Sequence, residues 1–346
     1  MDKRIAILGA GSWGTALAIL AARNGCQTLL WGHNAAHVAA LAHDRQNQRY
    51  LPGLPFPEPL TITAQLSDIA NFGDVLLVCV PSHAFKTTLL ALKPYLAEDI
   101  KIAWATKGFN TDDGSLLHET VAEIFSKTTP AAIISGPSFA SEVAADLPTA
   151  ITIASLQIDF ANQLADIFHS GRFRTYTSSD LIGVEVGGAV KNVLAIAAGI
   201  ADGLGFGANT RAALITRGLT EIIRLGVELG GKQETLMGLA GLGDLVLTCT
   251  DDQSRNRRLG LALGRGKNRA QAIEEIGQEI EGVSAAKQTY LLAKKHAIDM
   301  PITEQTYKVL YEGLDPLIAV QNLLSREVKP ELPLQPEQPT LIASQY

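Results

Sequence analysis

The sequence predicts an α/β protein: an N-terminal, Rossmann-like, doubly wound, mainly parallel sheet followed by an all-helical C-terminal domain. Up to about residue 180, short β-rich runs alternate with helix-like stretches, which is typical of parallel strands joined by helices. The run 74–80 is almost continuously apolar, as expected of a central strand covered on both faces. From Asp180 onward, Leu, Ala and Ile recur at helical spacing instead.

The expected elements follow from these patterns in chain order. We expect domains at residues 1–180 and 181–328, with helices that include Ala212–Leu229 and Ala285–His296. Residues 329–346 contain four prolines and no periodic apolar face, which predicts an extended or disordered tail. The expected strands are Ile5–Leu8, Thr28–Trp31, Leu60–Thr63, Val75–Val80, Ile100–Ala105, Ala131–Ser135, Ala150–Ala154 and Phe173–Thr177.

Composition limits the class of protein. With 47% hydrophobic residues, 18% charged residues and a formal charge of −6, the chain has no global attraction for nucleic acid or an anionic membrane. Apolar runs such as 193–201 are shorter than the roughly 18 residues of a membrane span. Three widely spaced cysteines without a C-x-x-C pair favour a reducing compartment. We therefore expect a cytoplasmic protein that binds neither nucleic acid nor membrane, with any phosphate site built locally.

A glycine-rich turn joins the first strand to the first helix. In residues 9–14, G-A-G-S-W-G, Gly9 makes the tight turn, Gly11 lets a pyrophosphate approach the backbone, and Gly14 lets helix and strand pack closely. The helix N-terminus would face the anion. The turn predicts a dinucleotide site, and the alternatives are an accidental glycine-rich turn or a secretory signal. The crowded glycines and the strand-like run that follows argue against a signal.

The coenzyme prediction rests on a missing acid. NAD-specific folds of this type place an acidic residue about 20 positions after the glycines, but no Asp or Glu occurs between Asp2 and Asp44. The second strand is followed by Gly32, His33 and Asn34, which would not repel a 2′-phosphate. We predict that NADPH is accepted, either alongside NADH or in preference to it, with His33 near the 2′-phosphate. The alternative is that His33 is an ordinary exposed loop residue.

Lys191 is the strongest candidate for chemistry. It is the only charged residue between Glu185 and Asp202, in an otherwise apolar helical segment. Burying a lone ammonium is costly without partners, and such a lysine can be tuned towards neutral pH for general acid–base work. The alternative is a lysine that extends its amine to solvent.

Four further segments offer polar groups. A glycine-rich loop leads to Asp244, and in a helix Asp244 and Thr248 would share one face. Ser254, Arg255 and Asn256 form a donor set for a phosphate, although alone they could be a solvated basic turn. Lys107 and the Gly136–Ser138 turn follow expected strands, at the sheet edge where ligands bind. Alone, that turn could be only an N-cap.

Taken together, these blocks resemble the bacterial NAD(P)-dependent glycerol-3-phosphate dehydrogenases. The order and spacing of the blocks match over residues 5 to about 315, whereas the proline-rich tail lies outside the resemblance. The matching blocks are residues 9–16, 105–108, 136–143, 185–192, 241–245, 254–256 and 281–282.

The resemblance implies reduction of the triose phosphate dihydroxyacetone phosphate to sn-glycerol 3-phosphate by a homodimer, feeding phospholipid synthesis. It implies that Lys191 exchanges a proton with the C2 oxygen, with Lys107, Asp244 and Thr248 beside it. The implied substrate contacts are Lys107, Gly136, Ser138, Lys191, Asp244, Ser254, Arg255 and Asn256. The implied coenzyme contacts, beyond the glycines, are Ser12, Trp13, His33, Lys107, Ala140, Arg255, Glu281 and, through its backbone, Glu279.

Two other functions compete with this one. Another two-domain dehydrogenase would act on a hydroxy acid or a sugar-acid phosphate. A non-catalytic NADP sensor would keep the first domain but leave Lys191, Asp244 and Arg255 without a purpose. The sequence shows no helix-turn-helix or basic patch that would provide a DNA-binding output.

Overall fold

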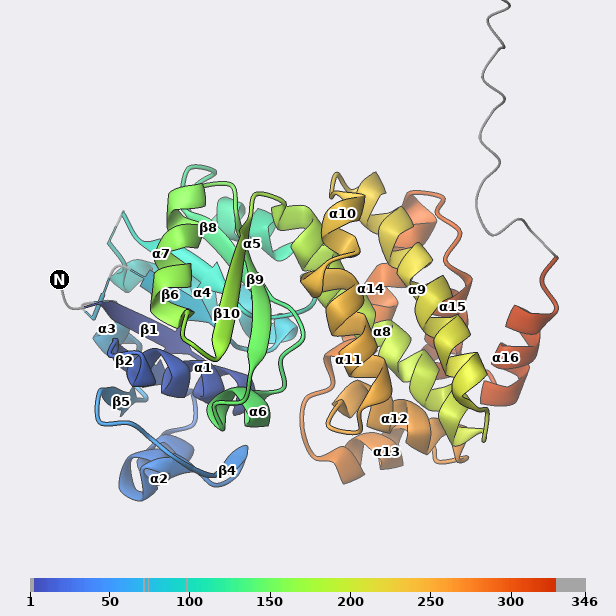
Figure 1. Ribbon diagram of the computed structural model, residues 1–346, viewed down its shortest axis with the longest axis horizontal. Helices are drawn as coiled ribbons and strands as arrows, with labels where there is room; N and C mark the ends of the chain where they lie inside the picture. The colour runs from blue at the N-terminus through green and yellow to red at the C-terminus, as the bar shows by residue number, and fades with distance from the viewer. Residues whose placement is uncertain (1–2, 71, 74, 98, 328–346) are drawn as a thin grey trace, which may run out of the picture.

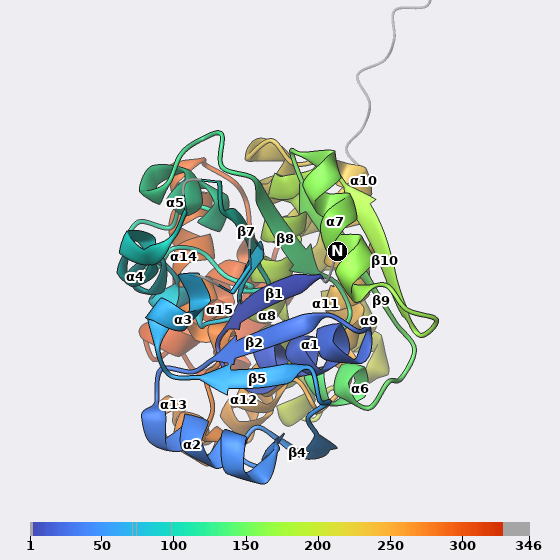
Figure 2. The ribbon, with the colours of Figure 1, turned by 90° about the vertical axis from the view of Figure 1, so that its left-hand side faces the viewer.

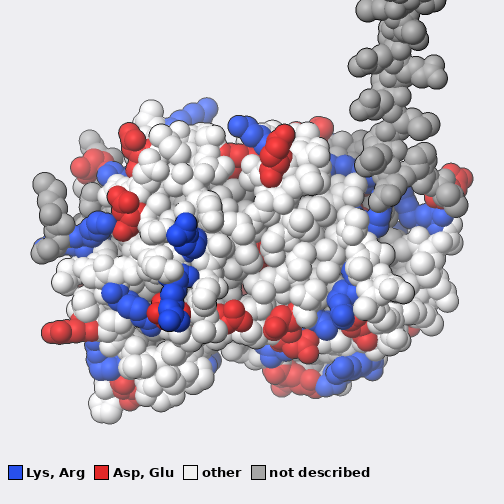
Figure 3. Space-filling model, viewed as in Figure 1, with Lys and Arg blue, Asp and Glu red and all other residues white. Residues whose placement is uncertain are grey.

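The computed structural model describes residues 3–70, 72–73, 75–97 and 99–327. The predicted tail, residues 329–346, lies outside the described residues. An N-terminal half built on a sheet stands beside a helical C-terminal half (Figure 1). On the face drawn in Figure 3, the basic and acidic side chains of the described residues are interspersed, so neither sign dominates that surface.

The N-terminal half is built on an eight-stranded sheet in the order β10-β9-β8-β7-β6-β1-β2-β5. Neighbouring strands are parallel except β8 and β9, which pair antiparallel, so the prediction of a mainly parallel sheet is confirmed. In Figure 2, β1, β2 and β5 lie side by side. The strands are β1 Arg4–Leu8, β2 Gln27–Trp31, β5 Leu60–Thr63, β6 Val75–Val78, β7 Lys101–Trp104, β8 Ala131–Ser135, β9 Thr149–Ser155 and β10 Phe173–Ser178.

Helices cover both faces of this sheet because successive strand residues point to opposite sides. Ile5 and Ile7 of β1 belong to a core with α1, α6 and α7, whereas Ala6 and Leu8 belong to a core with α3, α4 and α5. The sheet therefore has a hydrophobic core and covering helices on each face, which is the doubly wound arrangement. The helices are α1 Ser12–Arg23, α2 Ala35–Asp44, α3 Leu66–Ala70, α4 Ser82–Leu92, α5 Leu117–Ile124, α6 Ala140–Ala144 and α7 Ile158–Phe168, with a 3-10 turn at Lys93–Tyr95.

A small antiparallel hairpin, β3 Gln46–Asn47 and β4 Leu51–Pro55, follows α2 and was not predicted from the sequence. Its first strand has two residues and its second contains two prolines, which normally argue against a strand. It forms a separate two-stranded sheet near α2 (Figure 1).

The C-terminal half is helical throughout its described residues and is organised around α8. Although α8 meets the length and apolarity of a membrane span, contrary to our expectation from shorter runs, 89% of its most apolar window is buried, which makes it a core helix. The helices are α8 Leu181–Gly203, α9 Ala208–Glu228, α10 Gln233–Leu236, α11 Asp244–Thr250, α12 Arg255–Gly264, α13 Arg269–Ile276, α14 Glu281–Lys295, α15 Pro301–Tyr311 and α16 Pro316–Leu324, with a π-helical turn at Leu239–Gly243.

Helices α8 and α12 cross with their backbones in direct contact. A Cβ added to Gly199 of α8 would lie 2.2 Å from the Arg257 carbonyl oxygen, and one added to Gly260 of α12 would lie 2.1 Å from the Ile196 carbonyl oxygen. Only glycine permits this approach. The crossing fixes the helix that carries Lys191 against the helix that carries Arg255.

We expect Gly260→Ala to lower the free energy of unfolding by about 1–3 kcal/mol, because the added methyl forces the two helices apart. Urea or thermal unfolding measures this effect. Gly171→Ala is the matched control, since its Cβ would meet no atom within 4 Å. Equal stability of the two variants would contradict the close crossing.

Candidate active site

A cleft of about 1270 Å³ lies between the two halves of the molecule. The sheet contributes the segments that follow the carboxyl ends of β1, β2, β6 and β7, and the helical half contributes residues of α8, α11 and α12. The structure places every predicted site residue in its wall except Gly14 and Gly136, which lie behind it. Those in the wall are Gly9, Gly11, Ser12, Trp13, His33, Lys107, Ser138, Ala140, Lys191, Asp244, Thr248, Ser254, Arg255, Asn256, Glu279 and Glu281.

The glycine-rich turn has the shape that a dinucleotide needs. Gly9 has φ +117°, and a Cβ on Gly14 would lie 2.0 Å from the Gly9 carbonyl oxygen, so helix and strand pack as expected. A Cβ on Gly11 would meet no atom within 4 Å, which leaves open backbone at the helix N-terminus. The buried indole N–H of Trp13 has no acceptor among the described residues. These features fit a pyrophosphate cradle.

Two lysines and one carboxylate meet deep in the cleft. Lys191 Nζ lies 2.5 Å from Asp244 Oδ1, and Lys107 Nζ lies 2.7 Å from Asp244 Oδ2. The side chains of Lys191, Lys107 and Asp244 are 8%, 13% and 2% exposed. With both lysines protonated, the three side chains carry a net charge of +1, although the whole chain has a formal charge of −6. The alternative of a solvent-directed Lys191 is wrong.

Burial and the neighbouring charges shift the pKa values of Lys191 and Asp244. Burial lowers the pKa of Lys191 to about 8, with the Lys107 charge acting the same way and Asp244 opposing both. Burial acts to raise the pKa of Asp244, but the neighbouring charges of Lys107 and Lys191 outweigh it and hold that pKa below its usual range. Lys191 can therefore gain or lose a proton near physiological pH, while Asp244 stays ionised.

Thr248 completes the cluster from the next turn of α11. Its hydroxyl donates to the Asp244 carbonyl oxygen at 2.6 Å and accepts from Lys191 Nζ at 2.9 Å. The i,i+4 placement expected from the sequence is present, because Asp244 and Thr248 both lie in α11.

Asn256 differs from the simple phosphate donor expected from the sequence. Its carboxamide donates to Asn192 Oδ1 and accepts from the Gly282 backbone N–H, both at 2.9 Å. Asn192 in turn donates to the Lys107 carbonyl oxygen at 3.3 Å. One N–H of Asn256 is left for a ligand, and the network ties three segments of the wall together. Sequence reasoning missed Asn192, whose only signal was its position beside Lys191.

The remaining predicted substrate residues come from both halves of the chain. Ser254 caps α12 by accepting from the Arg257 N–H at 3.2 Å, which sets Arg255 in the first turn. The Gly136 carbonyl oxygen accepts from Lys107 Nζ and from Ser138 Oγ, each at 3.0 Å. Gly136 therefore orients Lys107 from behind the wall.

Glu281 and Glu279 reach across the cleft to the start of α4. Glu281 accepts from Ser82 N–H at 3.0 Å and from Ser82 Oγ at 2.6 Å. Burial raises the pKa of Glu281, and these hydrogen bonds oppose the rise. Glu279 lies 3.7 Å from His83 Nδ1. Both acids therefore contact the N-terminal half of the chain, a bridge that the sequence could not indicate.

A second bridge closes another side of the cleft. Gln253 accepts from Ser141 Oγ at 2.6 Å and donates to Glu142 Oε1 at 3.0 Å. Ser141 and Glu142 belong to α6, whose first residue is the predicted coenzyme contact Ala140. Sequence reasoning missed Gln253, because its partners lie more than 100 residues away.

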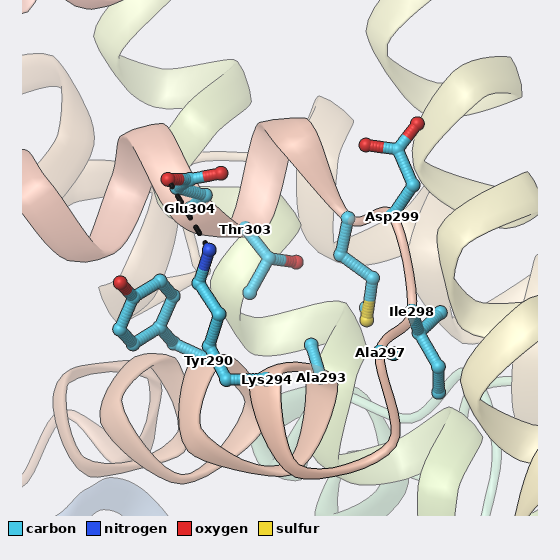
Figure 4. Close-up of a pocket in the computed structure, with 9 residues that line it drawn as sticks. Tyr290, Ala293, Lys294, Ala297, Ile298, Asp299, Thr303 and Glu304 are labelled. Carbon is cyan, nitrogen blue, oxygen red and sulfur yellow. Dashed lines mark ion pairs between the residues drawn. The ribbon is translucent and has the colours of Figure 1, made fainter.

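A smaller cavity of about 290 Å³ lies between α14 and α15 (Figure 4). Lys294 and Glu304 face each other there at 3.7 Å. It contains none of the predicted site residues, whereas the large cleft gathers nearly all of them. The chemistry is therefore assigned to the large cleft.

Comparisons with known proteins decide the family. The N-terminal and C-terminal models of NAD-dependent glycerol-3-phosphate dehydrogenase match residues 4–161 and 180–321. The chain belongs to the NAD-dependent glycerol-3-phosphate dehydrogenase family. It is 56% identical over 328 residues to the glycerol-3-phosphate dehydrogenase [NAD(P)+] of Pseudoalteromonas translucida, covering 94% of this chain and 98% of that protein. The Methylococcus capsulatus protein of that name is 56% identical over 332 residues, covering 96% and 99%.

Solved structures agree with this membership. The glycerol-3-phosphate dehydrogenase of Coxiella burnetii superposes with a TM-score of 0.92 at 53% identity, covering 94% of this chain and 99% of that one. A ketopantoate reductase from Ralstonia eutropha has a TM-score of 0.58 at 17% identity, covering 92% and 99%. The second likeness shows only a shared fold.

Proposed function

We propose that this chain interconverts dihydroxyacetone phosphate and sn-glycerol 3-phosphate with NAD(P)(H). The observation that carries the proposal is the buried cluster of Lys191, Asp244 and Lys107, in a family member whose relatives match over nearly their full length. The cluster and the pyrophosphate cradle of residues 9–14 line the same cleft, so hydride transfer and proton transfer can take place there together.

Each residue of the cluster has a separate task. The bound coenzyme supplies the hydride chemistry at C2. Lys191, as an ammonium, donates a proton to the C2 oxygen during reduction and accepts one as an amine during oxidation. Lys107 adds positive charge where the oxyanion develops, and preorganised charge of this kind is usually the largest catalytic contribution. Asp244 holds both lysines, and Thr248 fixes the Lys191 amine by a hydrogen bond.

The substrate phosphate is bound at the start of α12. Arg255 supplies a guanidinium, and Ser254 and Asn256 supply further donors beside the helix N-terminus. Ser138, which follows β8 of the N-terminal half, also lines the cleft. Arg255 therefore adds a second local positive charge to the cleft, beside the lysine cluster.

One assay tests the function against its rivals. NADPH or NADH oxidation is followed with and without dihydroxyacetone phosphate, and also with a 2-keto acid. The proposal expects oxidation that depends on the triose phosphate. Oxidation that depends only on the keto acid supports the rival dehydrogenase, and coenzyme binding with no oxidation supports a sensor.

We also propose domain bounds of 1–180 and 181–328, a cytoplasmic location, and supply of glycerol 3-phosphate for phospholipid synthesis. The end of β10 at Ser178 and the start of α8 at Leu181 support the bounds. The three cysteines are unpaired, which fits a reducing compartment.

A homodimer is the last part of this proposal. The exposed apolar side chains Leu317, Ile318 and Leu324 of α16 offer a surface for a second copy of the chain. Light scattering should therefore give twice the chain mass of 36.8 kDa. A mass equal to that of one chain would contradict the dimer.

A further inference from the structure

We propose that Arg49 recognises the 2′-phosphate of NADP(H) and thereby sets the coenzyme preference. This inference rests on the proposed function, because it assigns a residue to the coenzyme end of the same cleft. Arg49 lies between β3 and β4, in the hairpin that the sequence did not predict. It occupies the cleft wall together with His33, Asn34, His37 and Tyr50.

Asn47 holds this segment against the glycine-rich turn. Its side chain is fully buried and donates to the Ala10 carbonyl oxygen at 3.1 Å and to Thr15 Oγ1 at 2.9 Å. Its Oδ1 accepts from the Tyr50 backbone N–H at 3.2 Å. The residues flanking Arg49 are therefore tied directly to the pyrophosphate cradle, so Arg49 is anchored beside it.

The surroundings of Arg49 match the adenosine end of a dinucleotide. The cleft wall here includes Gly32, His33 and Asn34, which follow β2, and in this fold the ribose of the adenosine lies at the end of the second strand. The rings of His37 and Tyr50 meet edge to face at 5.3 Å, and Arg49 Cζ lies 5.0 Å from the Tyr50 ring centroid. Tyr50 therefore supports the guanidinium from one side.

The charge of Arg49 is available to a ligand. Arg49 is exposed and has no hydrogen bond or ion pair among the described residues. By contrast, Arg45 donates to the Leu60 and Pro57 carbonyl oxygens, each at 2.8 Å, so its guanidinium is engaged by the segment between β4 and β5. No acid occurs between Asp2 and Asp44 to repel a phosphate, and Asp44 itself contacts His43 at 2.8 Å.

An arginine suits this task better than His33, the residue expected from the sequence. A guanidinium keeps its charge across the physiological pH range and can bind two phosphate oxygens in parallel, whereas an imidazole loses its charge within that range. His33 lies in the same wall and remains a neighbour of the site.

The test compares Arg49→Gln with Arg49→Lys, His33→Gln and Arg174→Gln. Arg174 is an exposed arginine of β10, the strand at the end of the eight-stranded sheet that is farthest from β2 and β5. Arg174→Gln therefore controls for the loss of one positive charge. For Arg49→Gln we expect kcat/KM to fall about 10- to 100-fold with NADPH, as for loss of a charged hydrogen-bond partner, and less than about threefold with NADH. Arg49→Lys should fall between wild type and Arg49→Gln, and Arg174→Gln should match wild type.

Calorimetric binding of adenosine 2′,5′-bisphosphate and of 5′-AMP gives a readout without turnover. Arg49→Gln should weaken the bisphosphate at least tenfold and leave 5′-AMP nearly unchanged. Equal losses for both nucleotides, or a preference that follows His33→Gln and not Arg49→Gln, would overturn the assignment. Because this binding needs no triose phosphate, it separates failure of the Arg49 assignment from failure of the proposed reaction.

Discussion

Lys191→Ala should lower kcat by about 100-fold or more, the range of general acid–base contributions. The variant removes the proton donor for the C2 oxygen but leaves the glycine cradle untouched, so coenzyme binding should persist. Lys107 still pairs with Asp244 at 2.7 Å, so the buried carboxylate keeps a cation and the fold should survive. Steady-state kinetics and NADPH fluorescence titration measure the two quantities separately.

Lys294→Ala is the matched control for this variant. Lys294 contacts Glu304 in the smaller cavity and is 59% exposed. We expect its kcat to match wild type. Near-normal turnover in Lys191→Ala would refute the proton-transfer role of Lys191, because the variant has no ammonium at that position.

Asp244→Asn should have a comparably large effect and should also move the pH profile. In wild type, the reduction rate should fall as pH rises through about 8, since the acid form of Lys191 is then lost. The oxidation rate should rise over the same interval, since it needs the amine. These opposite limbs identify a single group that acts as acid in one direction and base in the other.

The asparagine variant removes the charge that opposes burial, so the pKa of Lys191 should fall further and both limbs should move to lower pH. We also expect kcat to fall about 100-fold, because both lysines lose the carboxylate that orients them. Circular dichroism checks that the variant is folded. An unchanged pH midpoint in a folded variant would show that Asp244 does not tune Lys191.

Local patterns made the N-terminal elements predictable. The strand, glycine turn and helix from Arg4 to Arg23 are specified by residues within one short segment, and each glycine there meets a local steric need. The β3–β4 hairpin was missed because nothing local favours it: Asn47 is held by Ala10 and Thr15, more than 30 residues away.

The candidate site shows the same division. Lys191 was predicted because an ammonium in an apolar helix must find a partner, and that requirement is visible in the chain. Asn256 was understood only in part, because the sequence shows a donor but not that Asn192 and Gly282 use it. The bridges from Glu281 to Ser82 and from Gln253 to α6 could not be predicted either, because each joins residues that are far apart in the sequence.

The amino-acid sequence was sufficient to predict the two-part architecture, the dinucleotide cradle and the residue types of the reaction, because periodicity, turn chemistry and the cost of buried charge act over short stretches of chain. It could not show that one carboxylate holds two lysines, or that Arg49 stands beside the cradle. Such contacts join residues far apart in the chain, so their distances and charges exist only once the chain has folded.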